Sequence, residues 1–305
     1  MTTTLSAPPS APTPPADLSP KRTGRAVRNW IATVLMGLSF LIVLIPLGFI
    51  LYTVIQKGWQ AVTTSGWFTD DIPPVRRTGP GMGPAIVGTI LTTGLATLMA
   101  VPLGILGAIY LHEYGKTGRL ASVLRFFADV MTGVPSIIMG LFIFTIWVVR
   151  FGVDGVNAFA GALALGCLML PIVIRSTEEM LKLVPNDLRE ASLALGSSQS
   201  RTILGIVLPA ALPGIVSGVL LAVARAAGET APLLFTIGAA TSINWNPFSG
   251  PNTALSVQIF GNAQQPFAGA QERAWGAALT LIAMTFILLV LSRIVAARFN
   301  PMKGR

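Results

Sequence analysis

The chain alternates between long apolar runs and shorter polar segments. The apolar runs cover about residues 30–55, 85–111, 126–149, 156–174, 203–227 and 274–297. Each run is close to the roughly 20 residues that a tilted helix needs to cross the hydrocarbon core of a membrane. None has the strict alternation of a barrel strand, and only closed hydrogen-bonding structures are stable in lipid. The pattern therefore predicts an all-α integral membrane protein with six transmembrane helices.

The composition excludes an ordinary water-soluble enzyme. Charged residues make up 11% of the chain, against about 25% in a typical soluble domain, and the mean hydropathy is +0.70. There is a single cysteine, Cys167, and a single histidine, His112. The chain therefore has no material for an intrachain disulfide or for a metal site built from several Cys or His ligands.

The positions of the basic residues predict the topology. Residues 1–29 form a proline-rich segment with a basic flank, which is expected to be a disordered cytoplasmic tail ahead of the 30–305 transmembrane region. With the amino end inside, 15 of the 21 Lys and Arg residues fall on the inner side, in agreement with the positive-inside rule. The net charge of +9 is thus mainly a topological signal and not one for nucleic acid. Both termini are expected in the cytoplasm.

The inner polar segment, residues 175–202, contains a spaced motif. Glu190-Ala191-Ser192 is followed by three residues, Gly196, nine residues, and Ile206-Val207-Leu208-Pro209. Apolar and small side chains in it recur at helical spacing, and Gly196 permits the left-handed turn that ends a helix. The motif resembles the Glu-Ala-Ala signature of the membrane subunits of ABC importers, with Ser192 in place of the second alanine.

This resemblance implies a type I ABC importer permease fold with a cytoplasmic coupling helix. It implies that Glu190, Ala191, Ser192, Gly196, Leu208 and Pro209 belong to the coupling segment, through which residues 188–200 contact a separate ATPase subunit. ATP and Mg²⁺ would then bind to that partner, and this chain would hold no cofactor. The alternative interpretation of the segment is an ordinary amphipathic helix at the membrane interface.

The fifth apolar run ends in a charged pair. Arg225 and Glu229 are four residues apart and share a helix face if the helix continues past Gly228. A charge inside a membrane span is costly, so it marks a candidate functional site. The alternative is a structural ion pair near the outer interface. The same run carries small residues at four-residue spacing, which favour close helix packing: Gly214, Gly218 and Ala222.

The string from Ala224 to Leu234 narrows the resemblance to the PstA-type permeases of bacterial phosphate ABC importers. Matching stretches also occur at 133–137, 171–178, 183–185, 266–268 and 274–275. The resemblance covers about residues 30–300. It implies import of inorganic phosphate across the bacterial plasma membrane, with a PstC-type second permease, a PstB-type ATPase dimer and an external phosphate-binding protein as partners.

The resemblance and the chemistry together select the residues of the substrate path. Arg225 offers paired donors that match a tetrahedral oxyanion, and Glu229 and Thr230 follow it in the same string. Arg175, at the inner end of the fourth run, is expected either to aid exit of the anion or to anchor the helix at the interface. Alternative substrates are phosphonate, sulfate and molybdate. An ion channel or ion-coupled carrier leaves the coupling motif unexplained.

Overall fold

The computed structural model describes residues 24–115 and 118–298, and within them the chain is helical with no strand. The elements are α1 (Gly24–Thr63), α2 (Gly83–Ile109), the π-helix η1 (Tyr110–Tyr114), α3 (Arg119–Gly133), α4 (Ser136–Ile143), the π-helix η2 (Phe144–Val148), α5 (Val149–Phe151), the 3-10 helix η3 (Gly152–Gly155), α6 (Ala158–Lys182), α7 (Asn186–Ala194), α8 (Gln199–Thr202), the π-helix η4 (Ile203–Val207), α9 (Leu208–Ala227), α10 (Leu233–Thr236), α11 (Leu255–Ala263) and α12 (Ala268–Arg298).

The chain divides into two compact units, Met1–Leu51 and Tyr52–Arg305. In the first unit, the described part of α1 is apolar on every side and its described side chains are exposed. A helix of this kind belongs in an apolar environment. The expected disordered tail at 1–29 lies outside the described residues as far as position 23, whereas positions 24–29 are helical. Positions 24–29 therefore belong to α1.

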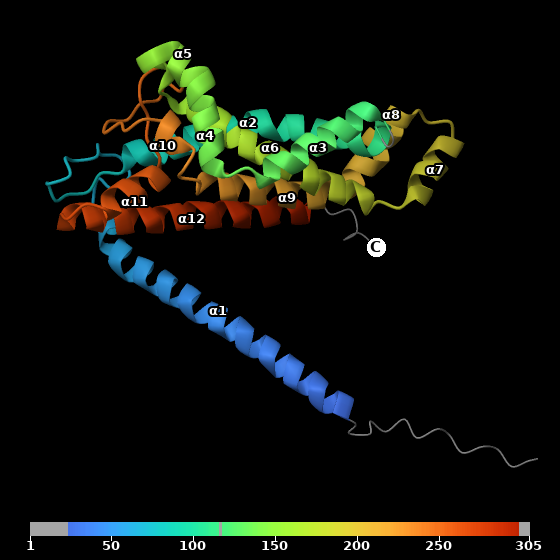
Figure 1. Cartoon of the computed structure of the whole chain (residues 1–305), viewed down its shortest axis with the longest axis horizontal. Coiled ribbons are helices and arrows are strands. Elements are labelled where there is room, and N and C mark those ends of the chain that lie inside the picture. Colours follow the sequence, from blue (N-terminus) through green and yellow to red (C-terminus); the bar gives the residue numbers. More distant parts are fainter. Residues whose placement is uncertain (1–23, 116–117, 299–305) are drawn as a thin grey trace, which may run out of the picture. The chain divides into compact units, whose positions relative to one another are not determined.

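The second unit is built around α6, which packs between α2 and α9, while α12 lies along α9 and α11 (Figure 1). The main core forms where α2, α6 and α9 meet, and it includes the buried side chains of Leu165, Met169, Val173 and Ile215. One end of the unit carries α7 and α8, and is called the α7 end below. The other end carries α10 and α11, and is called the α11 end (Figure 1).

Within residues 24–115 and 118–298, six helical stretches are long and apolar enough to cross a membrane, which agrees with the predicted number of spans: Ala26–Thr63, Gly83–Tyr114, Ser136–Gly155, Ala158–Lys182, Gln199–Ala227 and Ala268–Leu291.

The third predicted span, 126–149, is wrong in its first part. The helix breaks after Gly133, where Val134 is extended (φ −75°, ψ 129°), and a new helix begins at Ser136. The cause is Pro135, because a proline disfavours helical geometry in the residue that precedes it. The amphipathic α3 is therefore a separate helix, and the candidate span begins after the proline.

The predicted inner segment 175–202 also needs correction. Residues 175–182 continue α6 to Lys182 and are not loop. Only the remainder leaves the bundle, as α7 and α8 joined by a short turn. This last part of α6 is charged, and one of its charged residues, Glu178, is buried and ion-paired.

At the α11 end, long connections pack onto the helices. Trp67 is fully buried, and its Nε1 donates to Thr280 Oγ1 of α12 at 3.0 Å. Segment 252–256 lies against α2, where Leu255 N donates to Thr89 Oγ1 at 2.8 Å. At the adjacent position of α2, a Cβ placed on Gly88 would lie 1.9 Å from the carbonyl oxygen of Thr253. The absence of a side chain at Gly88 allows this close approach.

Replacing Gly88 should therefore destabilise the protein. The Gly88→Ala change places a methyl group against backbone, which cannot rotate away, and is expected to cost about 1–3 kcal/mol. Gly94→Ala is the matched control on the same helix, because nothing lies within 4 Å of its Cβ position. The measurement is the unfolding temperature of the purified protein in detergent. Equal unfolding temperatures for the two variants would contradict the close packing of 252–256 on α2.

Candidate functional site

The motif segment forms a short exposed helix at the α7 end. Glu190 and Ala191 lie on α7 with exposed side chains, and Leu193 and Leu195 are 48% and 88% exposed. Gly196 has φ +81° and its N donates to Leu193 O at 2.9 Å, so it ends the helix in the left-handed conformation that glycine adopts without strain. The helix thus presents apolar and acidic side chains away from the rest of the unit.

The rest of the motif joins α7 to the beginning of α9. Ser192 is buried, and its hydroxyl is 2.8 Å from that of Thr202, so a hydroxyl at this alanine position has a partner. Leu208 packs against the main core, while Pro209 is exposed in the first turn of α9. The π-turn η4 comes just before Pro209, which has no N–H and whose ring would clash with the carbonyl four residues earlier in a regular helix.

A buried ion pair fastens α7 to the end of α2. Glu113, in η1, has a side chain only 5% exposed, and its Oε1 accepts from Arg189 Nη2 at 2.9 Å and from Arg189 Nε at 3.2 Å. The same guanidinium donates to Leu181 O at 2.9 Å and to Val184 O at 2.6 Å. These carbonyls belong to the last turn of α6 and the residues after it, which have no partner within the helix. Arg189 therefore joins α2, α6 and α7 at one point.

A second buried carboxylate lies nearby on α6. Glu178 is 5% exposed, and its Oε1 is 3.4 Å from both Arg125 Nε of α3 and Lys182 Nζ. Arg125 also donates to Leu111 O at 2.6 Å. Glu113 and Glu178 were not selected as candidate site residues from the sequence. The sequence signal available for them was their position just after the apolar runs 85–111 and 156–174. A carboxylate buried at such a position needs a cationic partner, because an unpaired buried charge is unfavourable.

A groove of about 310 Å³ lies beside α7. Its lining combines the buried ion pair with exposed positions of the motif helix: Glu113, Asn186, Arg189, Glu190, Leu193, Gln199, Thr202 and Ile203. Gln199 Nε2 donates to Glu113 O at 2.9 Å, so a hydrogen bond joins two of the lining residues. The groove thus has both apolar and polar lining residues, and it lies next to the exposed face of α7.

Arg225 lies near the α11 end, in the last turn of α9. Its Nε is 3.5 Å from Glu229 Oε1, and the two side chains are 69% and 19% exposed. The helix ends at Ala227, so Glu229 lies in the following turn, where its carbonyl accepts from Ser256 Oγ of α11 at 2.9 Å. Thr230 is half-buried, and its carbonyl accepts from the first residues of α10. The structure therefore brings Arg225 and Glu229 together and places Thr230 beside them.

Arg225 shares an exposed face of α9 with Leu221 and Ser217, which lie four and eight residues earlier, respectively. The small residues of α9 lie on another face. A Cβ on Gly218 would be 1.6 Å from Ser176 Oγ, and one on Gly214 would be 2.2 Å from Met180 Sδ. Ala222 is buried in the main core. The small residues therefore pack within this chain, against α6.

Arg175 lies on α6 and pairs with Asp129 of α3, with both side chains about half exposed. Because Gly218 of α9 faces Ser176 of the antiparallel α6, Arg225 is displaced from Arg175 by about six residues, or roughly 9 Å, along the helix axes. The two arginines therefore lie at different depths along the helix axes.

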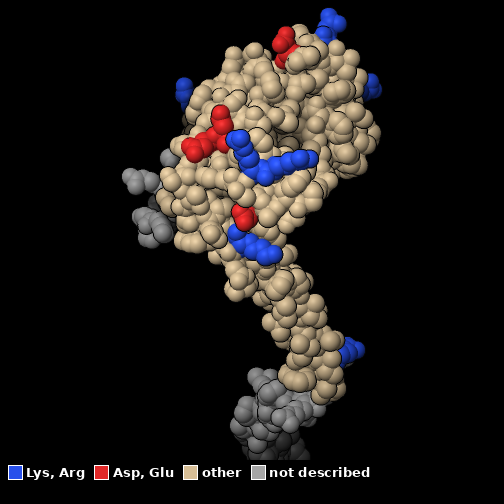
Figure 2. All heavy atoms as spheres, turned by 90° about the vertical axis from the view of Figure 1, so that its left-hand side faces the viewer, with Lys and Arg blue, Asp and Glu red and all other residues tan. Residues whose placement is uncertain are grey.

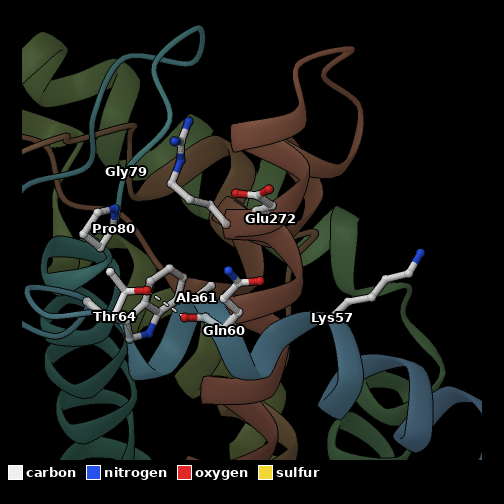
Figure 3. Close-up of a pocket in the computed structure, with 9 residues that line it drawn as sticks. Lys57, Gln60, Ala61, Thr64, Gly79, Pro80 and Glu272 are labelled. Carbon is white, nitrogen blue, oxygen red and sulfur yellow. Dashed lines mark hydrogen bonds between the residues drawn. The ribbon is translucent and has the colours of Figure 1, made fainter.

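The α11 end is poor in charge. Figure 2 views this end, where scattered acidic and basic side chains lie in a mostly uncharged surface. A pocket of about 140 Å³ here is lined by residues that include Lys57, Gln60, Thr64, Glu272 and Arg273. Lys57 extends away from the other labelled side chains (Figure 3), and its Nζ lies 5.0 Å from the centroid of the Trp275 ring.

Arg273 is not free to bind a ligand in this pocket either. It is 1% exposed and donates to Arg77 O at 2.8 Å and to Val75 O at 3.4 Å. It thereby fixes the connection between α1 and α2. With Glu272 also in the lining, this pocket does not gather positive charge for an anion.

Six membrane-length helices, with a short exposed helix linked to them at one end, define a multi-pass helical membrane permease. A family profile described as the binding-protein-dependent transport system inner membrane component matches residues 100–303. The chain belongs to this family, which accounts for the Glu190 to Pro209 motif at the α7 end.

Curated relatives cover most of the chain. It is 47% identical over 273 residues to the phosphate transport system permease protein PstA 1 of Mycobacterium tuberculosis strain H37Rv, covering 89% of this chain and 88% of that protein. It is 42% identical over 279 residues to the phosphate transport system permease protein PstA of Yersinia pestis, with coverages of 91% and 93%.

Solved structures share the fold at low identity. A bacterial alginate ABC transporter, in complex with a periplasmic protein bound to an alginate pentasaccharide, matches with a TM-score of 0.63 and 13% identity over 90% of this chain and 96% of that chain. The inward-facing MetNI methionine ABC transporter matches with a TM-score of 0.53 and 18% identity over 72% and 94%. The fold is that of ABC importer permeases, as the motif predicted.

Proposed function

We propose that this chain is a permease subunit of an ATP-driven ABC importer for inorganic phosphate. The observation that carries the proposal is the extent of the similarity to permeases named for phosphate, 47% identity over 89% of the chain. The paired Arg225 and Glu229, exposed near the α11 end, supply chemistry that suits this substrate. ATP with Mg²⁺ would bind to a separate ATPase, and this chain would need no cofactor.

Phosphate recognition would centre on Arg225. Its guanidinium offers parallel N–H donors to two oxygens of the anion, and its exposed side chain is available to the aqueous path. Glu229 opposes tight binding by its charge and accepts a hydrogen bond from a protonated phosphate oxygen. Thr230 lies beside the pair, and Arg175 is a second cationic position about 9 Å further along the helix axes. Weak successive contacts suit a transport path, because the anion must also leave.

The partners would be arranged around the two ends of the unit. A PstC-type permease would contact the exposed face of α9 that carries Arg225. A PstB-type ATPase dimer would dock on α7 and the adjacent groove, where Glu190 and Leu193 are accessible, and an external phosphate-binding protein would meet the α11 end. We expect the α7 end and both termini to face the cytoplasm of a bacterial cell, and the excess of basic residues in the inner segments supports this orientation.

Transport by the reconstituted complex tests the proposal. The permease pair and its ATPase, placed in proteoliposomes with the binding protein, should accumulate radiolabelled phosphate only when ATP is supplied. Unlabelled phosphate should compete fully, whereas sulfate, molybdate and methylphosphonate at equal concentration should not. Stronger competition by one of those three anions would reassign the substrate. Accumulation that does not require ATP would instead indicate a channel or a carrier.

A further inference from the structure

The buried contacts of the second unit form a continuous connection between α7 and the Arg225–Glu229 pair. It begins at Arg189 and Glu113, follows α2, crosses to α11 at Thr89 and Leu255, and reaches Glu229 through Ser256. We propose that this connection transmits displacement of α7 to the substrate pair, with Arg189 as its positioning residue. The proposal rests on the proposed function, because it assumes that an ATPase moves α7.

The first contact ties α7 firmly to α2. Among the described residues, the cation that neutralises Glu113 from another element is Arg189, and the remaining contact is the adjacent His112 at 3.9 Å. Separating α7 from α2 would leave a carboxylate that is 5% exposed without its arginine, which is strongly unfavourable. The end of α2 should therefore follow α7 when α7 moves. Glu178 differs, because its partners lie on α3 and on α6 itself.

The second part of the connection is α2 with its terminal π-turn. Together they span Gly83–Tyr114, 32 residues, or about 48 Å at the rise of a helix. Close packing holds α2 against α6, since a Cβ on Gly104 would lie 2.6 Å from Val173 Cγ1. Displacement at Glu113 is thereby carried along the length of the unit to the α11 end.

The last contacts join α2 to the substrate pair. Thr89 is 2% exposed and accepts the backbone N–H of Leu255, which is fully buried. The next residue, Ser256, is 3% exposed and donates its hydroxyl to Glu229 O at 2.9 Å. Breaking either hydrogen bond would leave a buried polar group without a partner. A shift of α2 should therefore reposition Glu229 and, through it, Arg225.

The test measures the number of phosphate ions imported per ATP hydrolysed by the complete complex in proteoliposomes. Inactive or unfolded molecules lower both quantities together, so this ratio separates a role in coupling from a merely structural one. Glu113→Gln and Arg189→Lys should each lower the ratio about tenfold while the ATPase still co-purifies. The double variant should be no worse than the worse single variant, because both changes interrupt the same contact.

Ser256→Ala tests the distant end of the connection and should lower the ratio about threefold. If the Glu113 variant fails to assemble, the ratio measured for Ser256→Ala still tests whether the connection couples α7 to the substrate pair. Glu179→Gln and Arg201→Ala are the matched controls, because both side chains are exposed near the α7 end, and they should retain the wild-type ratio. Wild-type ratios in Ser256→Ala, or losses that simply add in the double variant, would overturn the proposal. A wild-type complex without ATP-dependent phosphate import would instead refute the proposed function.

Discussion

Arg225→Ala should lower phosphate uptake by at least about a hundredfold while leaving the complex assembled, because the two charge-assisted hydrogen bonds to the anion that we propose for Arg225 would be lost. Arg225 is 69% exposed, and its recorded ion pair is with Glu229 at 3.5 Å. Its removal therefore leaves the helix packing of α9 in place. The measurement is ATP-dependent uptake of radiolabelled phosphate, normalised to the amount of assembled complex.

Two further variants show whether a loss of uptake is specific to the guanidinium of Arg225. Arg225→Lys keeps the charge but loses the planar pair of donors, so it should retain part of the uptake and bind phosphate less selectively. Arg150→Ala removes an exposed arginine near the α11 end and should leave uptake unchanged. Normal uptake by a well-assembled Arg225→Ala complex would exclude Arg225 from the substrate path and leave it as a structural ion pair.

Gly196→Val is expected to reduce recovery of the ATPase with the permease by about tenfold, the effect of backbone strain of 1–3 kcal/mol. The reason is conformational, because Gly196 has φ +81° and nothing lies within 4 Å of its Cβ position. A β-branched residue does not adopt this conformation without strain. The turn after α7 must then reorganise, which displaces the exposed face carrying Glu190 and Leu193.

The matched control is Gly205→Val, which lies beyond α8 in the π-turn. Its Cβ position is also empty, but its φ is not in the left-handed region, so the ATPase should co-purify as with the wild type. Co-purification is measured with a tag on the permease in mild detergent. Equal recovery of the ATPase with both variants would show that the turn at Gly196 does not hold the docking surface in place.

The sequence predicts the number of membrane-length helices well, because the thickness of hydrocarbon fixes the length of apolar run that a span requires. The break at Val134 was missed even though Pro135 provides a local signal, since the apolar composition continues on both sides of it. The extension of α6 to Lys182 was missed for the opposite reason. Its charged residues indicate a loop until the tertiary partner of Glu178, Arg125, is known.

Part of the candidate site could likewise be predicted from the sequence, and part of it depends on contacts that only the fold creates. The motif from Glu190 to Pro209 and the Arg225–Glu229 pair have short or fixed spacing, so a single sequence displays them. The contact between Glu113 and Arg189 joins residues 76 positions apart, and no local pattern indicates which distant arginine a carboxylate meets. Ser256 and Glu229 likewise meet only because α11 folds back beside the end of α9.

The buried pair of Glu113 and Arg189 also has a thermodynamic consequence. If the position of α7 alters the affinity of Arg225 for the anion, occupancy of Arg225 must alter the affinity of α7 for its ATPase by the same factor. The connection therefore has no preferred direction of signalling. An anion bound at Arg225 would therefore change how tightly the ATPase is held at α7, so that the complex would assemble more or less firmly according to the supply of substrate.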